Sequence, residues 1–323
     1  MKNINKPGIN EQTTKAYQTP SPREGWGGCE EGWGGCEAFS AGSVCECNRA
    51  FHAETLHPMV SLIDMSQPCD GDCLKTDCYA VELRHGAAKS AEYGWRPCDF
   101  TDATLLCIAP DKEIDLAADD GTLLIFHPDL VKFTPLGARL REYSFFKYRQ
   151  DEALHMSCCE ERVIKRCFGC IGDELCRGVD EYSKDIISNI IDLLLNYCRR
   201  FYNRQFITRH EANVNTIAEL KSMIDGTLRS GEAARKGMPT AARMAARLGM
   251  SAGYLDDMLK NETGKSVAEH VQLRRLQTAK ELLVGSAMPV GDISSLLGFC
   301  TEQCFATVFR KATGCTPEEY RGK

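Results

Sequence analysis

The chain has 323 residues, of which 43% are hydrophobic and 26% charged, and its formal net charge is −6. This length gives room for about two domains, each large enough to bury its own core. The start of the chain lacks the apolar core of a signal peptide. The most apolar run, 186–195, is interrupted by Ser188, Asn189 and Asp192, which excludes a membrane span. We therefore expect a cytoplasmic protein.

Charge is divided unevenly along the chain. From Gly231 onward, 13 Lys and Arg face 10 Asp and Glu, a net charge of +3, and the preceding residues carry −9. A mildly basic C-terminal region is compatible with phosphate binding but does not by itself predict it.

Residues 1–50 are rich in Gly, Pro, Ser and Glu and contain a tandem duplication, EGWGGCE at 24–30 and again at 31–37. This composition predicts a disordered tail. Trp26 and Trp33 could form an interaction motif, but a repeat without function fits the composition better.

Residues 51–150 contain short apolar runs separated by Gly and Pro, with examples at 60–63, 79–83, 104–108 and 123–126. Several short strands at this spacing predict a β-sandwich or a β-barrel. His127 stands alone in its predicted strand, and the seven histidines form no H-x-H or H-E-x-x-H pair.

From Ala153 the pattern becomes helical, and 151–230 reads as a helical segment and linker. A stripe of large apolar residues marks one long helix through Gln205: Ile186, Ile190, Leu193, Leu194, Tyr197 and Phe201. The stripe either packs on its own domain or forms a dimer contact. We favour the dimer contact, through Ile190, Leu194, Tyr197 and Phe201, because the stripe continues for about five turns.

The C-terminal region repeats one pattern fifty positions apart. Leu255, Met258, Leu259, Lys260, Thr263, Gly264 and Ser266 are matched by Phe305, Val308, Phe309, Arg310, Thr313, Gly314 and Thr316. A Leu-Gly pair precedes each set, at 248–249 and 297–298. Each unit is therefore predicted to be a helix, a glycine turn and a second helix, which is a helix-turn-helix.

The boundaries of these helices follow from their capping residues. Thr240 begins the first unit, Ser251 caps its second helix and Gly264 ends it. A connecting helix over 266–284 spans roughly 28 Å, close to the ~34 Å repeat of the major groove. It could present both units to one side of a DNA duplex.

Residues from about 238 to 320 resemble the AraC/XylS family of bacterial transcription regulators. The resemblance lies in LDDMLKNETG at 255–264, AKELL at 279–283, LGF at 297–299 and FATVFRKATGCTPEEY at 305–320. Thr278, Cys304 and Cys315 depart from the family pattern without removing its framework. FHAETLHP, LLCIAPDKEI, TLLIFHPDLV and YSFFKY are similar to the cupin-like effector domains of one subgroup.

The resemblance implies an α+β protein with four parts: the tail 1–50, an effector or sensor domain 51–150, a helical dimerisation segment 151–230 and a DNA-binding domain 231–323. It further implies a cytoplasmic homodimer that binds promoter DNA and a small-molecule effector, contacts RNA polymerase and activates transcription.

The family pattern also implies the DNA-binding residues. On the first unit these are Ser251, Gly253, Tyr254, Asp256, Asp257 and Lys260, and on the second Thr301, Glu302, Gln303, Ala306, Thr307, Arg310 and Lys311. Two carboxylates on the first helix can accept only from cytosine, whereas Gln303 can read adenine. We therefore expect the second unit to dominate specificity, and Lys260, Arg310 and Lys311 to contact phosphates.

The 18 cysteines leave a second hypothesis open. Three groups could bind metal, at 45–47, 69–78 and 167–176, but only Cys167 and Cys170 have the two-residue gap of a zinc site, without a second arm. We expect no metal and no cofactor; the alternative is a redox or metal sensor that uses the same DNA-binding region. No phosphate loop or G-x-S-x-G motif is present, so we do not expect an enzyme.

Overall fold

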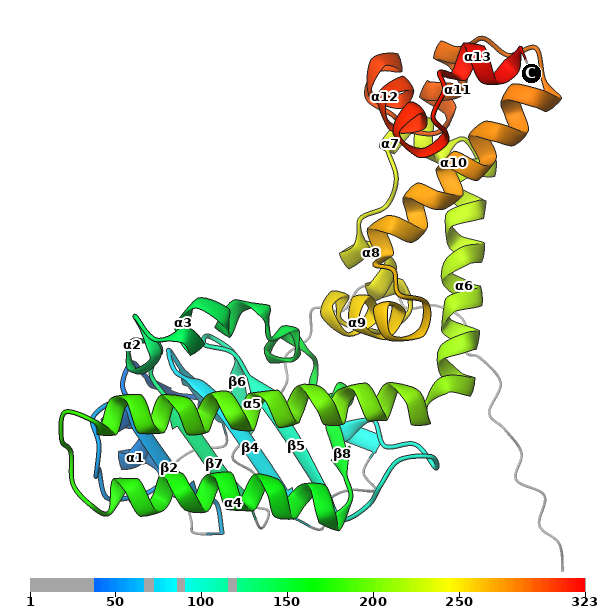
Figure 1. The fold of residues 1–323 in the computed structure, drawn as a ribbon. Helices are drawn as coiled ribbons and strands as arrows, with labels where there is room; N and C mark the ends of the chain where they lie inside the picture. The colour runs from blue at the N-terminus through cyan, green and yellow to red at the C-terminus, as the bar shows by residue number, and fades with distance from the viewer. Residues whose placement is uncertain (1–37, 67–72, 86–90, 116–120, 323) are drawn as a thin grey trace, which may run out of the picture. The chain divides into compact units, whose positions relative to one another are not determined.

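The computed structural model describes residues 38–66, 73–85, 91–115 and 121–322. They form an α+β structure whose N-terminal part contains two sheets and whose C-terminal part is helical (Figure 1). Within these ranges no helix is both long and apolar enough to cross a lipid bilayer.

The larger sheet has five antiparallel strands. Their order is β2 (Val60–Asp64), β7 (Gly121–Phe126), β4 (Tyr79–His85), β5 (Ala103–Ile108) and β8 (Leu154–Met156). The smaller sheet has the order β1 (Ala38–Ala41), β3 (Cys73–Thr76) and β6 (Glu113–Asp115), with β1 parallel to β3. The central strand β4 places Val81 opposite Leu124 on one side and Cys107 on the other.

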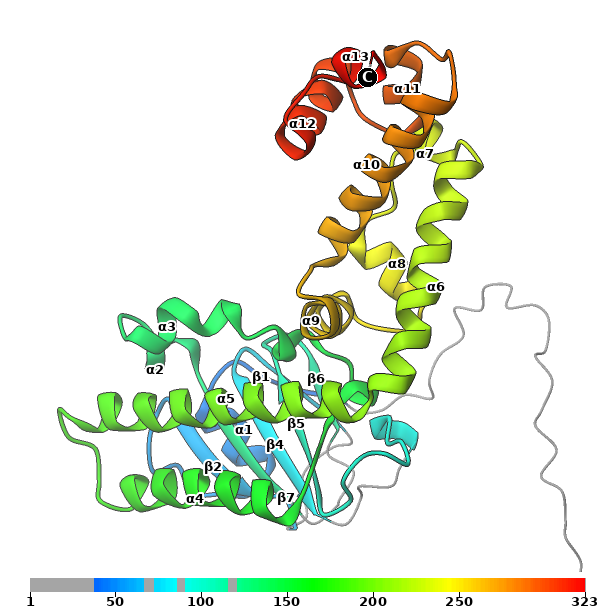
Figure 2. The same ribbon diagram turned by 45° about the vertical axis from the view of Figure 1, so that its right-hand side comes forward.

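Both faces of the larger sheet are covered. Ile63 and Leu123 on one face belong to a cluster with Leu74 of the smaller sheet and Val44 of helix α1 (Val44–Ala50). The other face is crossed by helices α4 (Cys158–Leu175) and α5 (Ser183–Thr208), which run side by side (Figure 1, Figure 2). Most of the segment that the sequence pattern predicts as helical is helical, and α5 extends past 186–205 at both ends. Its start is not: residues 154–156 pair with β5 as strand β8, so the helical part begins only at Cys158.

The expected cupin-like barrel is not what the described residues form. Their strands make two open sheets, and the interior strand β4 is buried along nearly its whole length. In a barrel one face of each strand points outward, whereas here α4 and α5 cover that face with apolar side chains. The short apolar runs predicted strands correctly but could not specify whether the sheet closes.

The predicted tail ends before residue 50. Residues 38–41 form β1, and α1 buries Val44, Cys47 and Ala50 between the sheets. Ser43 caps α1 by accepting from the Glu46 N–H at 3.3 Å. The EGWGGCE repeat at 24–37 lies outside the described residues.

Short helices lead from the larger sheet toward α4. They are α2 (Pro128–Val131), α3 (Pro135–Arg139) and the 3-10 helices η2 (Leu140–Glu142), η3 (Ser144–Lys147) and η4 (Gln150–Glu152). A further 3-10 helix, η1 (Ala91–Tyr93), precedes β5. After α5 the chain continues into α6 (His210–Arg229) and α7 (Glu232–Lys236).

The C-terminal region contains the duplicated pattern as two helix-turn-helix units. The first is α8 (Ala241–Arg247) and α9 (Ala252–Thr263), and the second is α11 (Val290–Leu296) and α12 (Glu302–Thr313). Helix α10 (Val267–Gly285) joins them, and α13 (Pro317–Arg321) follows. The turn glycines Gly249 and Gly298 have φ of 68° and 72°, a left-handed conformation that glycine adopts without steric cost.

Candidate nucleic-acid interface

The two helices predicted to read DNA, α9 and α12, begin and end alike. The hydroxyls of Ser251 and Thr301 each accept from a backbone N–H three residues later, both at 3.1 Å. Gly264 and Gly314 end the helices in the left-handed conformation. The capping residues inferred from the sequence, Thr240 for α8 and Ser251 and Gly264 for α9, are confirmed.

The second reading helix presents its polar face to solvent. Phe305 and Phe309 are fully buried and pack on Phe299 and Tyr320. The expected DNA-facing residues lie on the opposite side: Thr301, Glu302, Gln303, Thr307, Arg310 and Lys311 are exposed, and Ala306 is half-buried. This face combines donors, acceptors, an apolar group and two cations, as groove binding requires.

Helix α10 fixes the turn of the second unit. Arg275 stacks on the Phe299 ring at 3.5 Å from the centroid and donates to the Leu297 carbonyl at 2.9 Å. Burial lowers the pKa of this guanidinium. The turn is thus held by a cation over an aromatic face as well as by apolar packing.

The first reading helix has a different environment, and four of its expected DNA contacts, Tyr254, Asp256, Asp257 and Lys260, are engaged within the chain. Tyr254 is 2% exposed and packs on Tyr148 and Phe206. Its hydroxyl accepts from Arg209 at 3.0 Å, and Arg209 pairs with Asp99 at 2.6 Å. The assignment of Tyr254 to the DNA-facing set is therefore wrong in this arrangement, because its side chain is part of the core.

Asp256 caps the connecting helix. Its Oδ1 accepts from the Val267 N–H at 2.9 Å, and its Oδ2 pairs with Lys260 Nζ at 2.8 Å. The hydrogen bond to Asp256 raises the pKa of Lys260. A carboxylate at the N-terminus of α10 is stabilised by free backbone N–H groups, so this residue has a structural role that its position on α9 alone did not indicate.

Asp257 and Gly253 face the N-terminal part of the chain. The Asp257 carboxylate accepts from the hydroxyl of Ser144 and from that of Tyr148, the latter at 2.7 Å. A Cβ at Gly253 would lie 3.4 Å from the Tyr148 ring. Burial, followed by the Asp257 charge, raises the pKa of Tyr148, so its hydroxyl stays protonated and donates.

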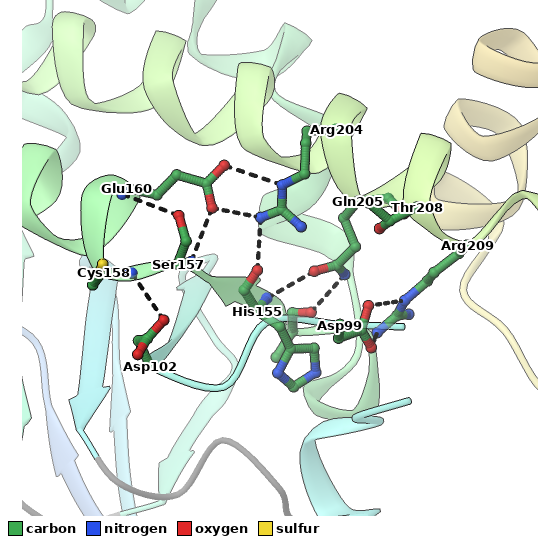
Figure 3. Close-up of polar contacts among 11 residues, drawn as sticks. Asp99, Asp102, His155, Ser157, Cys158, Glu160, Arg204, Gln205, Thr208 and Arg209 are labelled. Atoms are coloured by element: carbon green, nitrogen blue, oxygen red, sulfur yellow. Dashed lines mark hydrogen bonds and ion pairs between the residues drawn. The ribbon is translucent and has the colours of Figure 1, made fainter. Parts of the chain in front are cut away.

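A polar network joins β8 to the end of α5 (Figure 3). The His155 N–H donates to Gln205 Oε1 at 2.7 Å, and Gln205 donates to the Ala153 carbonyl at 3.0 Å. Arg204 binds Glu160 through two nitrogens, at 3.0 and 2.7 Å. These bonds fix the end of α5, from which Arg209 reaches Asp99 and Tyr254.

A cavity of about 460 Å³ lies between the larger sheet and the 145–150 segment. Its apolar lining includes Leu106 and Tyr202, and its polar lining includes Arg84, Lys112 and Arg149. Lys112 donates to the Tyr148 carbonyl at 2.9 Å, and burial lowers its pKa. Mixed apolar and polar walls around a partly open cavity of this size are typical of small-molecule sites.

The expected dimer residues divide between two faces of α5. Leu194 and Phe201 are 0% and 7% exposed and pack inside the protomer, so they cannot meet a second copy in this arrangement. Ile190 and Tyr197 are half-buried. The exposed apolar side chain between them is Leu193, at 50%.

The cysteines do not gather into a metal site within the described part of the chain, where no group of three or more His, Cys, Asp or Glu could hold an ion. Cys69 of the second predicted group lies outside that part. Burial raises the pKa of Cys107, and that of Cys167 to about 11. Because the thiolate is the reactive form, these buried thiols are poor redox sensors.

Comparison with known proteins matches the C-terminal region. A family model described as a helix-turn-helix domain matches residues 244–323. Regulatory protein SoxS of Salmonella typhimurium is 35% identical over 78 residues, 24% of this chain and 73% of that protein. The xylose operon regulatory protein of Escherichia coli is 32% identical over 74 residues, 23% of this chain, and the matched part is only 19% of that protein's length.

Among solved structures, the C-terminal domain of AraT, a response regulator from Geobacillus stearothermophilus, is 28% identical with a TM-score of 0.29. The match covers 33% of this chain and 83% of that one.

Proposed function

The chain belongs to the AraC/XylS family of DNA-binding transcription regulators, and we propose that it is a one-component regulator in which an effector bound in the N-terminal part controls promoter binding by the C-terminal part. The observation that carries this proposal is the exposed polar face of α12, with Gln303, Thr307 and Arg310 above a core of buried Phe305 and Phe309. Such a face is free to enter a major groove.

We propose the cavity of about 460 Å³ as the effector site. It is lined by the sheet on one side and by residues 145–150 on the other, and that segment also contacts α9. An effector in this position would touch Tyr148 and Arg149, which are bonded to the first helix-turn-helix unit.

The proposed regulator has a defined domain organisation and set of partners. Residues 231–323 form the DNA-binding domain and 51–150 contribute the effector domain, while 151–230 contribute β8, the helices α4 and α5 that pack on that domain, and then α6. The partners are promoter DNA, RNA polymerase and a second copy of the chain, and the outcome is activation. We place the dimer contact on the exposed face of α5 around Leu193 and no longer on Leu194, because Leu194 is buried.

Salt dependence of DNA binding tests the proposal. The full chain should bind duplexes enriched from a random pool, with an affinity that falls as salt rises. Arg310→Ala should weaken binding to every duplex and reduce the slope by about one unit. Arg177→Ala, which removes an exposed cation before α5, is the control and should leave the slope unchanged. If the salt dependence of DNA affinity had the same slope in both variants, Arg310 of α12 would not contact DNA.

A further inference from the structure

The internal repeat makes it possible to compare the two reading helices position by position. Gly253 and Asp257 of α9 correspond to Gln303 and Thr307 of α12, fifty residues later. Gln303 and Thr307 are exposed, whereas Asp257 is only partly exposed and hydrogen-bonded to Ser144 and Tyr148. The same face of the motif is therefore open in the second unit and covered in the first.

The N-terminus of α9 is covered as well. The Ser251 N–H donates to the carboxylate of Glu152 at 2.6 Å, and Glu152 is 4% exposed. The Arg149 guanidinium donates to the Gly249 carbonyl in the turn at 2.9 Å. Backbone N–H groups at the start of a reading helix are groups that bind DNA phosphates. A buried carboxylate thus occupies a position that suits a phosphate.

We propose that residues 144–152 form an intramolecular latch that holds the first reading helix away from DNA, and that DNA and this segment compete for one face of α9. The proposal rests on the proposed function, because it assigns a regulation to the same DNA-binding surface. Asp257 is then a latch residue and does not read bases while the latch is closed.

The latch is part of the wall of the cavity. Tyr148 receives a hydrogen bond from Lys112 at its carbonyl, inside the cavity, and donates one from its hydroxyl to Asp257. A ligand that moves Tyr148 or Arg149 changes the contacts that hold α9. The proposal therefore includes a direct physical connection between cavity occupancy and release of the first unit.

The test uses the full chain with Ser144→Ala and Tyr148→Phe combined. These changes remove both hydroxyl donors to Asp257 but keep the Tyr148 ring, and they leave every residue of the DNA-binding domain unchanged. Tyr143→Phe is the matched control, because Tyr143 directly precedes the latch and its hydroxyl bonds Asp192 at 3.1 Å, away from α9. Each of the three proteins is used to select bound duplexes from a random pool. The duplexes are roughly 40 base pairs long, about four helical turns.

Wild type and Tyr143→Phe should each enrich one half-site per protomer, read by the second unit alone. In the double variant each protomer should enrich two adjacent half-sites about 10 base pairs apart. The variant should bind such a site roughly tenfold more tightly than wild type does, since the fraction of chains with a released first unit rises. Hydrogen exchange without DNA should show faster exchange at 251–257 in the double variant only.

Other outcomes have distinct meanings. Faster exchange with unchanged motif and affinity would overturn the latch while leaving the proposed function standing. Unchanged exchange would show that these bonds do not hold α9 and would also overturn it. Failure of all three chains to enrich any DNA would overturn the proposed function and this inference with it.

Discussion

Tyr148 and Asp257 are 109 residues apart in the chain, and the tyrosine hydroxyl donates to the aspartate carboxylate at 2.7 Å. The bond joins the segment before β8 to the first reading helix. A hydrogen bond to a charged acceptor is about twice as strong as one between neutral groups. The bond therefore helps to hold α9 against the 144–152 segment. While it is formed, the Asp257 carboxylate faces that segment and is not free to accept a hydrogen bond from a DNA base.

Gln303 is expected to be a base-reading residue. Gln303→Ala should cost about 1–3 kcal/mol at one base-pair position and relax discrimination there, because a bidentate contact to adenine is lost. Binding to a panel of single-base operator variants measures this. Asp256→Asn with Asp257→Asn is the comparison. It should tighten binding to random DNA, because two carboxylates are removed and the bonds of Asp257 to the latch are weakened, and it should leave discrimination at the position read by Gln303 unchanged. If the Asp256→Asn, Asp257→Asn variant lost its preference for the operator sequence, α9 rather than α12 would be the helix that determines specificity.

The face of α5 that meets a second copy is tested at two neighbouring residues. Leu193→Glu should give monomers in sedimentation without loss of the fold, since Leu193 is 50% exposed. Leu194→Glu should instead lower thermal stability by several kcal/mol, because an unpaired carboxylate would be buried at a side chain that is 0% exposed. A Leu193→Glu chain that remains dimeric would exclude this face.

The DNA-binding domain should fold without the N-terminal part. A fragment of 231–323 contains both units and α10, and it should be helical and bind DNA. A fragment of 210–323 should melt at a higher temperature, because α6 packs Leu220 and Ile224 in the core and Asp225 binds Arg274. Each buried aliphatic side chain contributes about 1.5–3 kcal/mol. Equal melting temperatures would show that α6 belongs to the N-terminal part.

His155 should make stability depend on pH. Burial lowers the pKa of its imidazole to about 4, and within the described residues its Nδ1 has no hydrogen-bond partner. Above pH ~6.5 the ring is neutral in both the folded and unfolded chain. Below it, only the unfolded chain gains the proton, so the free energy of unfolding falls by up to about 1.4 kcal/mol per pH unit until pH reaches the folded value.

Urea unfolding of wild type and His155→Gln between pH 7.5 and 4 measures this contribution, in the range where histidine titrates. As pH falls, the free energy of unfolding of wild type should decrease relative to that of His155→Gln. A constant difference would show that His155 titrates alike in both states.

The local structure of the DNA-binding region follows from short-range patterns in the sequence. Cap residues such as Thr240 and Ser251, and glycines at the turns, act on neighbours within four residues, so their effect can be read from spacing alone. The long helix of α5 follows in the same way from its apolar period. The repeat at a fixed interval then identified two units.

Which faces of α5, α9 and α12 are exposed depends on tertiary packing. Asp257 and Thr307 occupy equivalent places in the repeat, yet only Asp257 meets residues from more than a hundred positions earlier. Leu193 and Leu194 are adjacent, and the packing of α5 on the sheet buries one and exposes the other. The runs that predicted strands were equally compatible with a barrel or with two sheets. In each case the outcome depends on contacts between distant segments, which a local pattern does not encode.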